Sequence, residues 1–364
     1  MNHPLPWLRL QLTPGLGRVG LIHLIEHFKT PEKVLDAAED GWPVLPGLRA
    51  NLAAMIPEET SPRIQEACQR LEEMGGWICT LWDLDYPEAL RQIPDPPALL
   101  YGCGSLPEGP AMAIVGTRHP TSFGRLFTEQ LAEDLAMLGL VVVSGMARGI
   151  DAAAHRGALR SGGRTLAVLG CGIDRIYPQE NALIYHQIIE QGALLSEYPP
   201  GSEPLPGHFP GRNRIISGLS KATLVIEASR NSGSLITAEF ALEQGREVMA
   251  VPGGVDRKTS YGPNLLIKQG AHPVTETQDV LEILGLGKSV SRDQHVKDAT
   301  ALPLAEPAGK VLAMLDLTPR HSDELAGESG LTPMELSAIL LQLELQGYAD
   351  KLPGGRYVRG RRVH

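Results

Sequence analysis

The stretch that decides the fold of this 364-residue sequence is Arg212–Gly253, RNRIISGLSKATLVIEASRNSGSLITAEFALEQGREVMAVPG. It contains one continuous apolar run, Ala222–Ala228, of the kind typical of a strand in a parallel sheet covered on both faces. The Gly- and Ser-rich turn Ser229–Ser234 follows that run and opens a helix. Ligands of open α/β sheets bind at this carboxyl edge, and the N–H groups at a helix N-terminus favour an anion. The stretch therefore predicts an edge that faces a phosphate, to which Arg212 and Arg214 supply mobile positive charge.

Strand–helix alternation extends this pattern through the middle of the chain. Short apolar runs alternate with segments of helix length, such as the amphipathic Phe123–Leu138 and Ile150–Arg160. The runs are Ala111–Gly116, Leu140–Val143, Thr165–Leu169, Ala193–Ser196, Ala222–Ala228 and Glu247–Val251. Repeated units of this kind predict an α/β fold with a Rossmann-like, doubly wound, mostly parallel sheet.

The segments on either side of this core differ from it in pattern. Residues 1–80 predict a helical, SAM-like (helix-hairpin-helix-like) domain, because the turns Pro14–Gly17 and Leu45–Leu48 each precede an amphipathic stretch. The same turns also fit plain helix starts. Residues 81–285 are assigned to the Rossmann-like domain, and residues 286–306, which lack periodicity, to a linker.

Residues 307–364 predict a winged-helix domain. Three segments of helix length are followed by a hairpin whose turn contains Pro353-Gly354-Gly355; the segments are Ala308–Leu315, Ser322–Glu328, Pro333–Gln346 and Tyr348–Arg359. We expect Ser322 to cap the second helix, and Thr332 with Glu335 to start the third. The third helix bears Glu335 and Glu344 but no Lys or Arg, so a protein contact or weak DNA binding is expected there rather than reading of the major groove.

Composition narrows the classes of function. The net charge of −9 argues against nucleic-acid binding, since phosphate neutralisation drives such binding. The excess of acidic residues is concentrated in residues 1–110, however, which contain 8 Lys+Arg and 15 Asp+Glu. A basic groove formed by later residues is therefore compatible with the net charge. The four cysteines form no CxxC pair, the histidines show no metal-ligand spacing, and no signal peptide or membrane span is visible. We expect a soluble cytoplasmic protein without a metal.

Several loops at the carboxyl edge of the expected sheet are candidate ligand contacts. Gly170-Cys171-Gly172 resembles a dinucleotide turn, but GxGxxG is incomplete and GxxxxGK[ST] is absent, so no nucleotide cofactor is expected. Ser144–Gly149 predicts a tight turn close to a ligand. Asp151 and His155, four residues apart on one helix face, are interpreted as structural because no nucleophile accompanies them.

Single-stranded nucleic acid fits the remaining candidates. Arg118 follows the first strand and so emerges at the same edge as the Ser229–Ser234 turn. Phe209 lies next to Arg212 and Arg214 in the sequence, which offers a base a stacking surface and a backbone two guanidinium groups.

Six segments in order resemble the DprA (Smf) family of DNA-processing proteins, from about residue 105 to 285. They are Ile114–Arg118, Ser144–His155, Leu166–Asn181, Ser196–Gly201, Phe209–Ser220 and Ser232–Gly253. The resemblance implies a non-catalytic protein that binds single-stranded DNA regardless of sequence, protects incoming DNA in natural transformation and loads the RecA recombinase onto it. It also implies a homodimer formed through the Rossmann-like domain.

The same resemblance assigns the contacts with DNA. They fall on Arg118, Ser144, Gly145, Arg148, Gly149, Phe209, Arg212, Asn213, Arg214, Ser232, Gly233 and Ser234. Some relatives carry a lysine ahead of the phenylalanine. Here that loop reads GSEPLPGH, with His208 as the nearest candidate and Glu203 opposing it.

Two alternatives remain beside this interpretation. The first is a nucleotide-processing hydrolase of the lysine-decarboxylase-like (phosphoribohydrolase) type, which resembles this sheet but shows PGGxGTxxE at the turn. The present turn reads NSGSLITAEF, without PGG and with Glu239 two residues beyond Thr237. The second is a winged-helix transcription regulator, which the acidic third helix of the tail disfavours.

Overall fold

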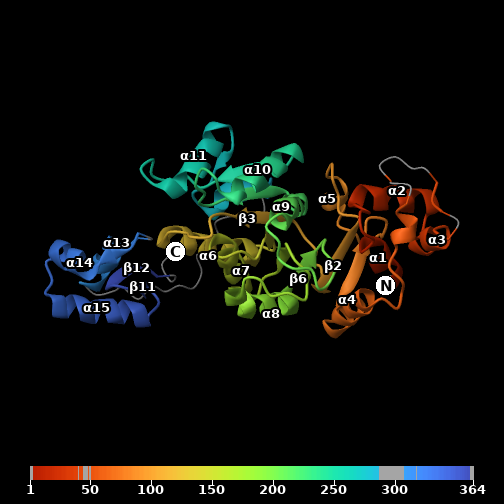
Figure 1. Ribbon diagram of the computed structural model, residues 1–364. Helices are drawn as coiled ribbons and strands as arrows, with labels where there is room; N and C mark the ends of the chain where they lie inside the picture. The colour runs from red at the N-terminus through yellow and green to blue at the C-terminus, as the bar shows by residue number, and fades with distance from the viewer. Residues whose placement is uncertain are drawn as a thin grey trace. The chain divides into compact units, whose positions relative to one another are not determined.

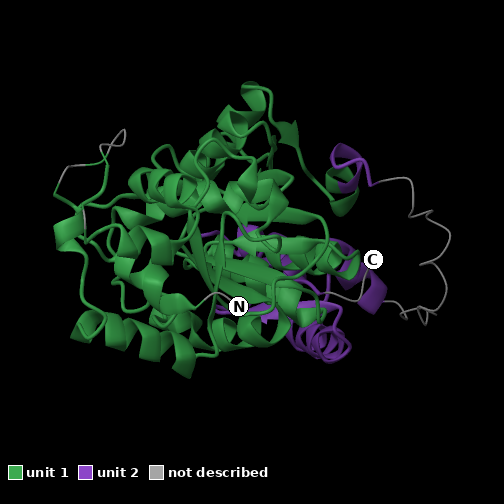
Figure 2. Cartoon of the chain, turned by 90° about the vertical axis from the view of Figure 1, so that its right-hand side faces the viewer, with its two compact units in different colours: residues 1–119, 128–280 green, residues 120–127, 281–364 purple. Residues whose placement is uncertain are grey.

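The computed structural model describes residues 3–39, 41–43, 48, 51–286, 307–316 and 318–360. The chain divides into two compact units, residues 1–119 with 128–280 and residues 120–127 with 281–364 (Figure 2). The first unit contains a large sheet and the N-terminal helices, and the second contains the C-terminal fold. Apart from Leu286, the segment assigned as a linker lies outside the described residues.

A nine-stranded sheet forms the centre of the first unit, with the strand order β1-β2-β6-β5-β4-β3-β7-β8-β9. The strands are β1 (Trp77–Thr80), β2 (Leu99–Gly104), β3 (Ala111–Val115), β4 (Val141–Ser144), β5 (Thr165–Leu169), β6 (Ala193–Ser196), β7 (Ala222–Val225), β8 (Glu247–Ala250) and β9 (His272–Pro273). From β6 to β9 every neighbouring pair is parallel, whereas β1 and β2 are antiparallel additions. The predicted mostly parallel sheet is therefore confirmed, with β7 ending at Val225 rather than at Ala228.

Helices cover both faces of this sheet. Those of the sheet region are α5 (Glu88–Arg91), α6 (Ser122–Met137), α7 (Ile150–Arg160), η2 (Gln179–Asn181), α8 (Ala182–Gln191), α9 (His208–Gly218), α10 (Gly233–Glu243), η3 (Lys258–Ser260), α11 (Tyr261–Lys268) and α12 (Thr277–Ile283). Figure 1 shows α7 and α8 on one side of the sheet, and α10 and α11 on the other. This two-sided cover explains why the central strands read as continuous apolar runs.

The N-terminal helices share their core with the sheet. They are α1 (Pro4–Gln11), α2 (Arg18–Phe28), α3 (Pro31–Asp36), η1 (Ala53–Met55) and α4 (Pro62–Glu73). Leu8 and Leu24 belong to the same buried cluster as Leu99 and Tyr101 of β2. The strand β1, inside the segment predicted as helical, is part of the sheet. Of the two predicted hairpin turns, the one at residues 14–17 joins α1 to α2, and residues 45–47 of the other lie outside the described residues.

The strand order places a crevice at one edge of the sheet. β3 pairs with β4 on one side and with β7 on the other, so consecutive connections leave β3 and β7 in opposite directions. Such a topological switch point opens a crevice beyond the carboxyl ends of the strands, where ligands of open α/β sheets bind.

The C-terminal unit has the winged-helix pattern. Its elements are α13 (Ala308–Met314), β10 (Arg320–His321), α14 (Ser322–Ser329), α15 (Pro333–Leu345), β11 (Ala349–Leu352) and β12 (Arg356–Arg359), with the strands in the order β10-β12-β11. Thr332 and Glu335 form the capping box that starts α15. The prediction for α14 was wrong by one residue: His321 is the N-cap and accepts from the Asp323 N–H, while Ser322 is the first helical residue.

No helix among the described residues is long and apolar enough to cross a membrane.

Candidate functional site

A cavity of about 510 Å³ lies at the carboxyl ends of β3 and β7. Its lining comes from the loop after β3, including Arg118, from the first turns of α9, and from the Ser229–Ser234 turn with the start of α10. The structure thus brings together, at the switch point, segments more than one hundred residues apart in the sequence.

Arg212 forms the fixed base of this cavity. Its side chain is buried, with the residue 4% exposed. Nη1 donates to the carbonyl of Gly145 at 2.7 Å and to that of Val168, and Nε donates to Asn213 Oδ1 at 3.2 Å. The guanidinium therefore caps the ends of β4 and β5, so the expectation that it is mobile was wrong. Nη2 makes no hydrogen bond to a described residue, and Arg212 still lines the cavity.

Asp151 lies beside Arg212 at the start of α7. Burial raises the pKa of its carboxyl, against the opposing charge of Arg212 and the N–H groups of Ala147 and Gly145. Gly145 separates the two charged groups: a Cβ there would stand 2.7 Å from Arg212 Nη2 and 2.8 Å from Asp151 Oδ2. Only glycine fits this position, which explains the glycine in the turn after β4.

His155 takes part in a separate, buried contact. Its Nδ1 lies 2.8 Å from Thr165 Oγ1, and that hydroxyl donates to the Val142 carbonyl. Nδ1 must therefore be the donor to Thr165, which leaves Nε2 unprotonated and without a partner among the described residues. Burial, followed by the charges of Arg212 and Arg156, lowers the pKa of His155 to about 3. These contacts fit the structural interpretation of His155.

The backbone of the turn after β4 is held from two sides. Gly149 has φ +79°, and a Cβ there would lie 2.4 Å from the Thr117 carbonyl, so the turn packs directly on the loop that carries Arg118. On the other side, Asn181 Nδ2 donates to the carbonyl of Met146 at 2.8 Å and to that of Ala147 at 3.4 Å. The site set predicted from sequence did not include Asn181, although its polar side chain in a loop at the carboxyl edge was a signal.

Phe209 is the aromatic centre of the site. The guanidinium carbons of Arg118 and Arg212 lie 5.8 Å and 5.7 Å from its ring centroid, within the range of cation–π attraction. Tyr177 lies 5.8 Å away at a tilt of 38° and is 43% exposed. Arg118 is exposed and Phe209 is half-buried. Tyr177 therefore extends the aromatic surface beyond the predicted residues.

The start of α10 supplies the polar wall. Ser232 is the N-cap, its hydroxyl accepts from the Ser234 N–H at 3.4 Å, and the two hydroxyl oxygens are 2.8 Å apart. Asn213 Nδ2 donates to the Gly233 carbonyl at 3.2 Å, which ties α9 to this turn. A Cβ placed on Gly233 would meet no heavy atom within 4 Å, so the backbone there is open toward the cavity. The positive end of a helix lined by hydroxyl groups suits an anionic oxygen.

Five of the predicted residues are not among those that line the cavity: Ser144, Gly145, Arg148, Gly149 and Arg214. Ser144 is fully buried and donates to the Ile114 carbonyl at 2.6 Å, so its hydroxyl joins two strands instead of facing a ligand. Arg148 is exposed, forms an ion pair with Glu180 at 2.6 Å, and lines a small cavity of about 30 Å³ to which Phe209 also contributes.

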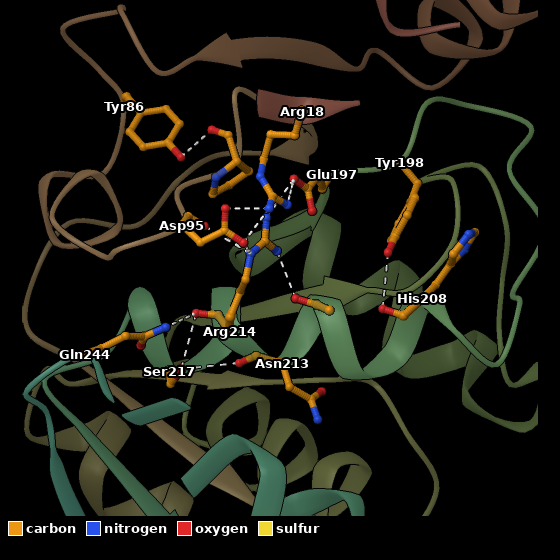
Figure 3. A network of polar contacts seen from close by, with 12 residues as sticks. Arg18, Tyr86, Asp95, Glu197, Tyr198, His208, Asn213, Arg214, Ser217 and Gln244 are labelled. Carbon is orange, nitrogen blue, oxygen red and sulfur yellow. Dashed lines mark hydrogen bonds and ion pairs between the residues drawn. The ribbon is translucent and has the colours of Figure 1, made fainter. Parts of the chain in front are cut away.

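Arg214, two residues after Arg212, belongs to a different network (Figure 3). It is 4% exposed, and it contacts Glu197 at 2.7 Å and Asp95 at 3.1 Å. Burial would lower the pKa of Arg214, but Glu197 and Asp95 outweigh that effect and raise it. Arg18 of α2 reaches the same two carboxylates. Arg214 therefore fastens α9 to the N-terminal helices and is neither mobile nor among the residues that line the cavity.

The loop ahead of Phe209 also differs from expectation. The His208 ring stacks on Tyr198 at 3.9 Å, and its Nδ1 lies 3.1 Å from the Gly170 carbonyl. Glu203 pairs with Arg175 at 2.8 Å rather than opposing His208. Among the described residues, no group of three or more His, Cys, Asp and Glu side chains is arranged to hold a metal ion.

Comparison with known proteins gives consistent matches over both units. A family model described as DNA recombination-mediator protein A matches residues 77–285, and one described as DprA winged helix domain matches residues 295–355. The Smf protein of Escherichia coli (strain K12) is 43% identical over 98% of this chain and 96% of its own length. The Smf protein of Synechocystis is 36% identical over 97% and 98%.

Two solved structures show the same fold. The DNA processing protein A (DprA) of Streptococcus pneumoniae superposes with a TM-score of 0.64 at 34% identity, covering 77% of this chain and 98% of its own. The DNA processing protein A of Helicobacter pylori, studied for its single-stranded DNA binding mode, gives a TM-score of 0.51 at 33% identity, covering 57% and 95%.

Proposed function

Because the chain belongs to the DNA recombination-mediator protein A (DprA/Smf) family, we propose that it binds single-stranded DNA regardless of sequence in the cavity beside Phe209. We propose further that it protects incoming strands in natural transformation, loads RecA onto them, acts in the cytoplasm and forms a homodimer through the Rossmann-like unit. The observation that carries the DNA-binding proposal is one aromatic ring flanked by two guanidinium groups at the N-terminus of α10.

Each part of the cavity has a separate role in this proposal. Phe209, extended by Tyr177, offers a stacking surface that every base can use, because every base has a π-face. Arg212 holds a positive charge at a fixed point, and the exposed Arg118 side chain can follow a phosphate. The N–H and hydroxyl groups at the start of α10, Ser232–Ser234, can donate hydrogen bonds to a second anionic oxygen. None of these contacts depends on the edge of a particular base, which fits binding without sequence preference.

A local site of this kind is compatible with a net charge of −9. Only a few phosphates need to be neutralised at the cavity, and stacking on aromatic side chains contributes about 1–3 kcal/mol per base. The hydrolase alternative depends on Glu239, which is exposed on α10 and is not among the described residues that line the cavity. The geometry therefore favours binding without cleavage.

The test compares Arg118→Ala with Arg257→Ala, since both remove an exposed arginine from the same unit and Arg257 lies outside the cavity lining. Arg118→Ala should weaken binding to oligo-dT about 10- to 100-fold, because a charge-assisted contact contributes about 1.5–3 kcal/mol. Arg257→Ala should bind as the parent does. Fluorescence anisotropy over a salt series gives both affinities, and the parent's affinity should fall as salt rises.

Equal affinities for the two variants would contradict the assigned cavity. The RecA step has its own readout: adding the protein to single-stranded DNA should shorten the lag of DNA-dependent ATP hydrolysis by RecA, and Arg118→Ala should lose part of that effect. Release of free base from nucleoside monophosphates would instead support the hydrolase alternative.

A further inference from the structure

The last helix of the C-terminal unit carries an apolar stripe on the face turned away from its core. α15 buries Leu336, Leu340 and Leu343. Its opposite face exposes Met334 to 84%, Leu341 to 55% and Leu345 to 81%. Ala338 lies between them and is also exposed. We call Met334, Ala338, Leu341 and Leu345 the α15 stripe; Figure 1 shows the helix that carries it.

The spacing of the α15 stripe is that of a helix–helix seam. Its members follow one another at intervals of four, three and four residues. This is the alternation of a and d positions in a heptad, which places successive side chains along one line of the helix. An exposed line of this kind is complementary to a second helix with the same spacing, and isolated exposed apolar residues do not produce it.

The charges beside the stripe select among possible partners. The positions that flank it, corresponding to e and g of the heptad, are Glu335, Ser337, Gln342 and Glu344. The whole of α15 has two glutamates and no lysine or arginine, so it does not attract a phosphate backbone. Two copies of α15 would bring two acidic helices together. A helix with basic e and g positions would instead pair its charges with Glu335 and Glu344.

We propose that the α15 stripe is a docking surface for a basic amphipathic helix of a partner protein. The apolar seam of that helix covers Met334, Leu341 and Leu345, and its basic flanks meet the glutamates. The winged-helix unit then acts as a protein-binding module, while DNA binds in the cavity of the other unit.

The test uses two synthetic three-heptad peptides with leucine at a and d, one with lysine and the other with glutamate at e and g. Each is labelled and titrated with the full chain in an anisotropy measurement. The lysine peptide should bind, and the glutamate peptide should bind at least about tenfold more weakly, which corresponds to about 1.4 kcal/mol. Glu344→Lys should weaken the lysine peptide and strengthen the glutamate peptide.

A matched pair of leucine variants locates the binding. Leu341→Ser should remove binding of the lysine peptide, whereas Leu242→Ser, at an exposed leucine (59%) of α10, should leave it unchanged. Because both leucines are exposed, the thermal unfolding of each variant should match the parent. If Leu341→Ser fails to fold, Met334→Ser takes its place.

Three results would overturn the proposal. One is binding of both peptides with equal affinity, or of neither. Another is a full-length assembly, seen by sedimentation, that becomes smaller with Leu341→Ser, because the stripe would then belong to a second copy of the chain. The last is a loss of oligo-dT affinity with Leu341→Ser, because the stripe would then serve DNA.

Discussion

Arg118 and Arg212 approach the same aromatic ring but differ in what holds them. Both guanidinium groups lie 5.7–5.8 Å from the Phe209 centroid. Arg118 is exposed, whereas Arg212 is buried against two carbonyl groups and next to Asp151. Removing the Arg118 side chain should therefore weaken only ligand binding, whereas removing that of Arg212 should also lower the stability of the fold.

Substitution of these two arginines should separate binding from stability. Arg212→Met should lower the free energy of unfolding by about 3–5 kcal/mol, because it leaves the buried Asp151 without its compensating charge. Arg118→Ala should stay within about 0.5 kcal/mol of the parent, as expected for an exposed site. Urea unfolding followed by circular dichroism measures both, and equal midpoints for the two variants would contradict the structural role of Arg212.

His155 should make the stability of the protein depend on pH below neutrality. Its pKa in the folded state is about 3, and in the unfolded chain it is about 6.5. Below pH 6.5 the His155 imidazole is therefore protonated in the unfolded chain but remains neutral in the folded chain. The stabilisation is complete above about pH 6.5 and is lost progressively as the pH falls toward about 3.

His155→Asn tests this dependence, because its amide can still reach Thr165. From pH 7 to pH 5, the free energy of unfolding should fall by about 2 kcal/mol less in the variant than in the parent. Leu242→Ser, an exposed substitution that changes no titratable group, is the control and should keep the parent's slope. Parallel pH profiles for His155→Asn and the parent would refute the assignment.

At the scale of single elements, helix starts give the sharpest comparison between sequence and structure. Thr332 and Glu335 were predicted to start α15, and they do so through a capping box. The predicted cap Ser322, in contrast, proved to be the first residue of α14. His321 takes the capping role there through Nδ1. A histidine ring is an uncommon cap, so residue preferences pointed to the neighbouring serine instead.

Alanine variants of the two positions should differ accordingly. Thr332→Ala should destabilise the C-terminal unit by about 1 kcal/mol, because it leaves the N–H of Glu335 without its cap. Ser322→Ala should change stability little, since its hydroxyl makes no capping bond. Differential scanning calorimetry of the full chain measures both, and a larger loss for Ser322→Ala would contradict the assigned caps.

Strands could be predicted where the sequence contains a continuous apolar run. They could not be predicted where strand formation depends on residues far away in the sequence. The six central strands are continuous apolar runs covered by helices. β1 and β2 depend on each other: the Trp77 ring occupies the space above Gly102, where a Cβ would come within 2.2 Å of it. The burial of Arg212 and Arg214 had the same cause, since their partners Gly145 and Asp95 are 67 and 119 residues away in the sequence. The sequence predicted the ligand-binding edge of the sheet, but not which arginines would be buried by hydrogen bonds within the protein.

At the scale of the whole molecule, the two units differ in how they depend on the rest of the chain. The N-terminal helices and β2 share one buried cluster, and Arg18 joins α2 to Arg214 through Asp95 and Glu197. The C-terminal unit has its own cluster, which includes Val311, Leu325 and Leu340. All residues that line the cavity belong to the first unit.

Deletions from the two ends should therefore have opposite consequences. Removing residues 307–364 should leave the affinity for oligo-dT within about threefold, a change of less than about 1 kcal/mol. Removing residues 1–76 should unfold the first unit, because each uncovered core side chain such as Leu99 or Tyr101 costs about 1.5–3 kcal/mol of a total that is rarely above about 15. Circular dichroism and anisotropy check both; a folded, DNA-binding product of the N-terminal deletion would contradict the shared core.

The fixing of Arg212 by two strand-end carbonyls has a thermodynamic consequence. A long cationic side chain ordinarily gives up about 1.5–2 kcal/mol of rotamer entropy when it becomes ordered. For Arg212 that loss is incurred during folding, so an arriving strand has to order the Arg118 side chain but not this one. Calorimetric titration with oligo-dT should accordingly show a smaller entropic opposition than two surface arginines would give.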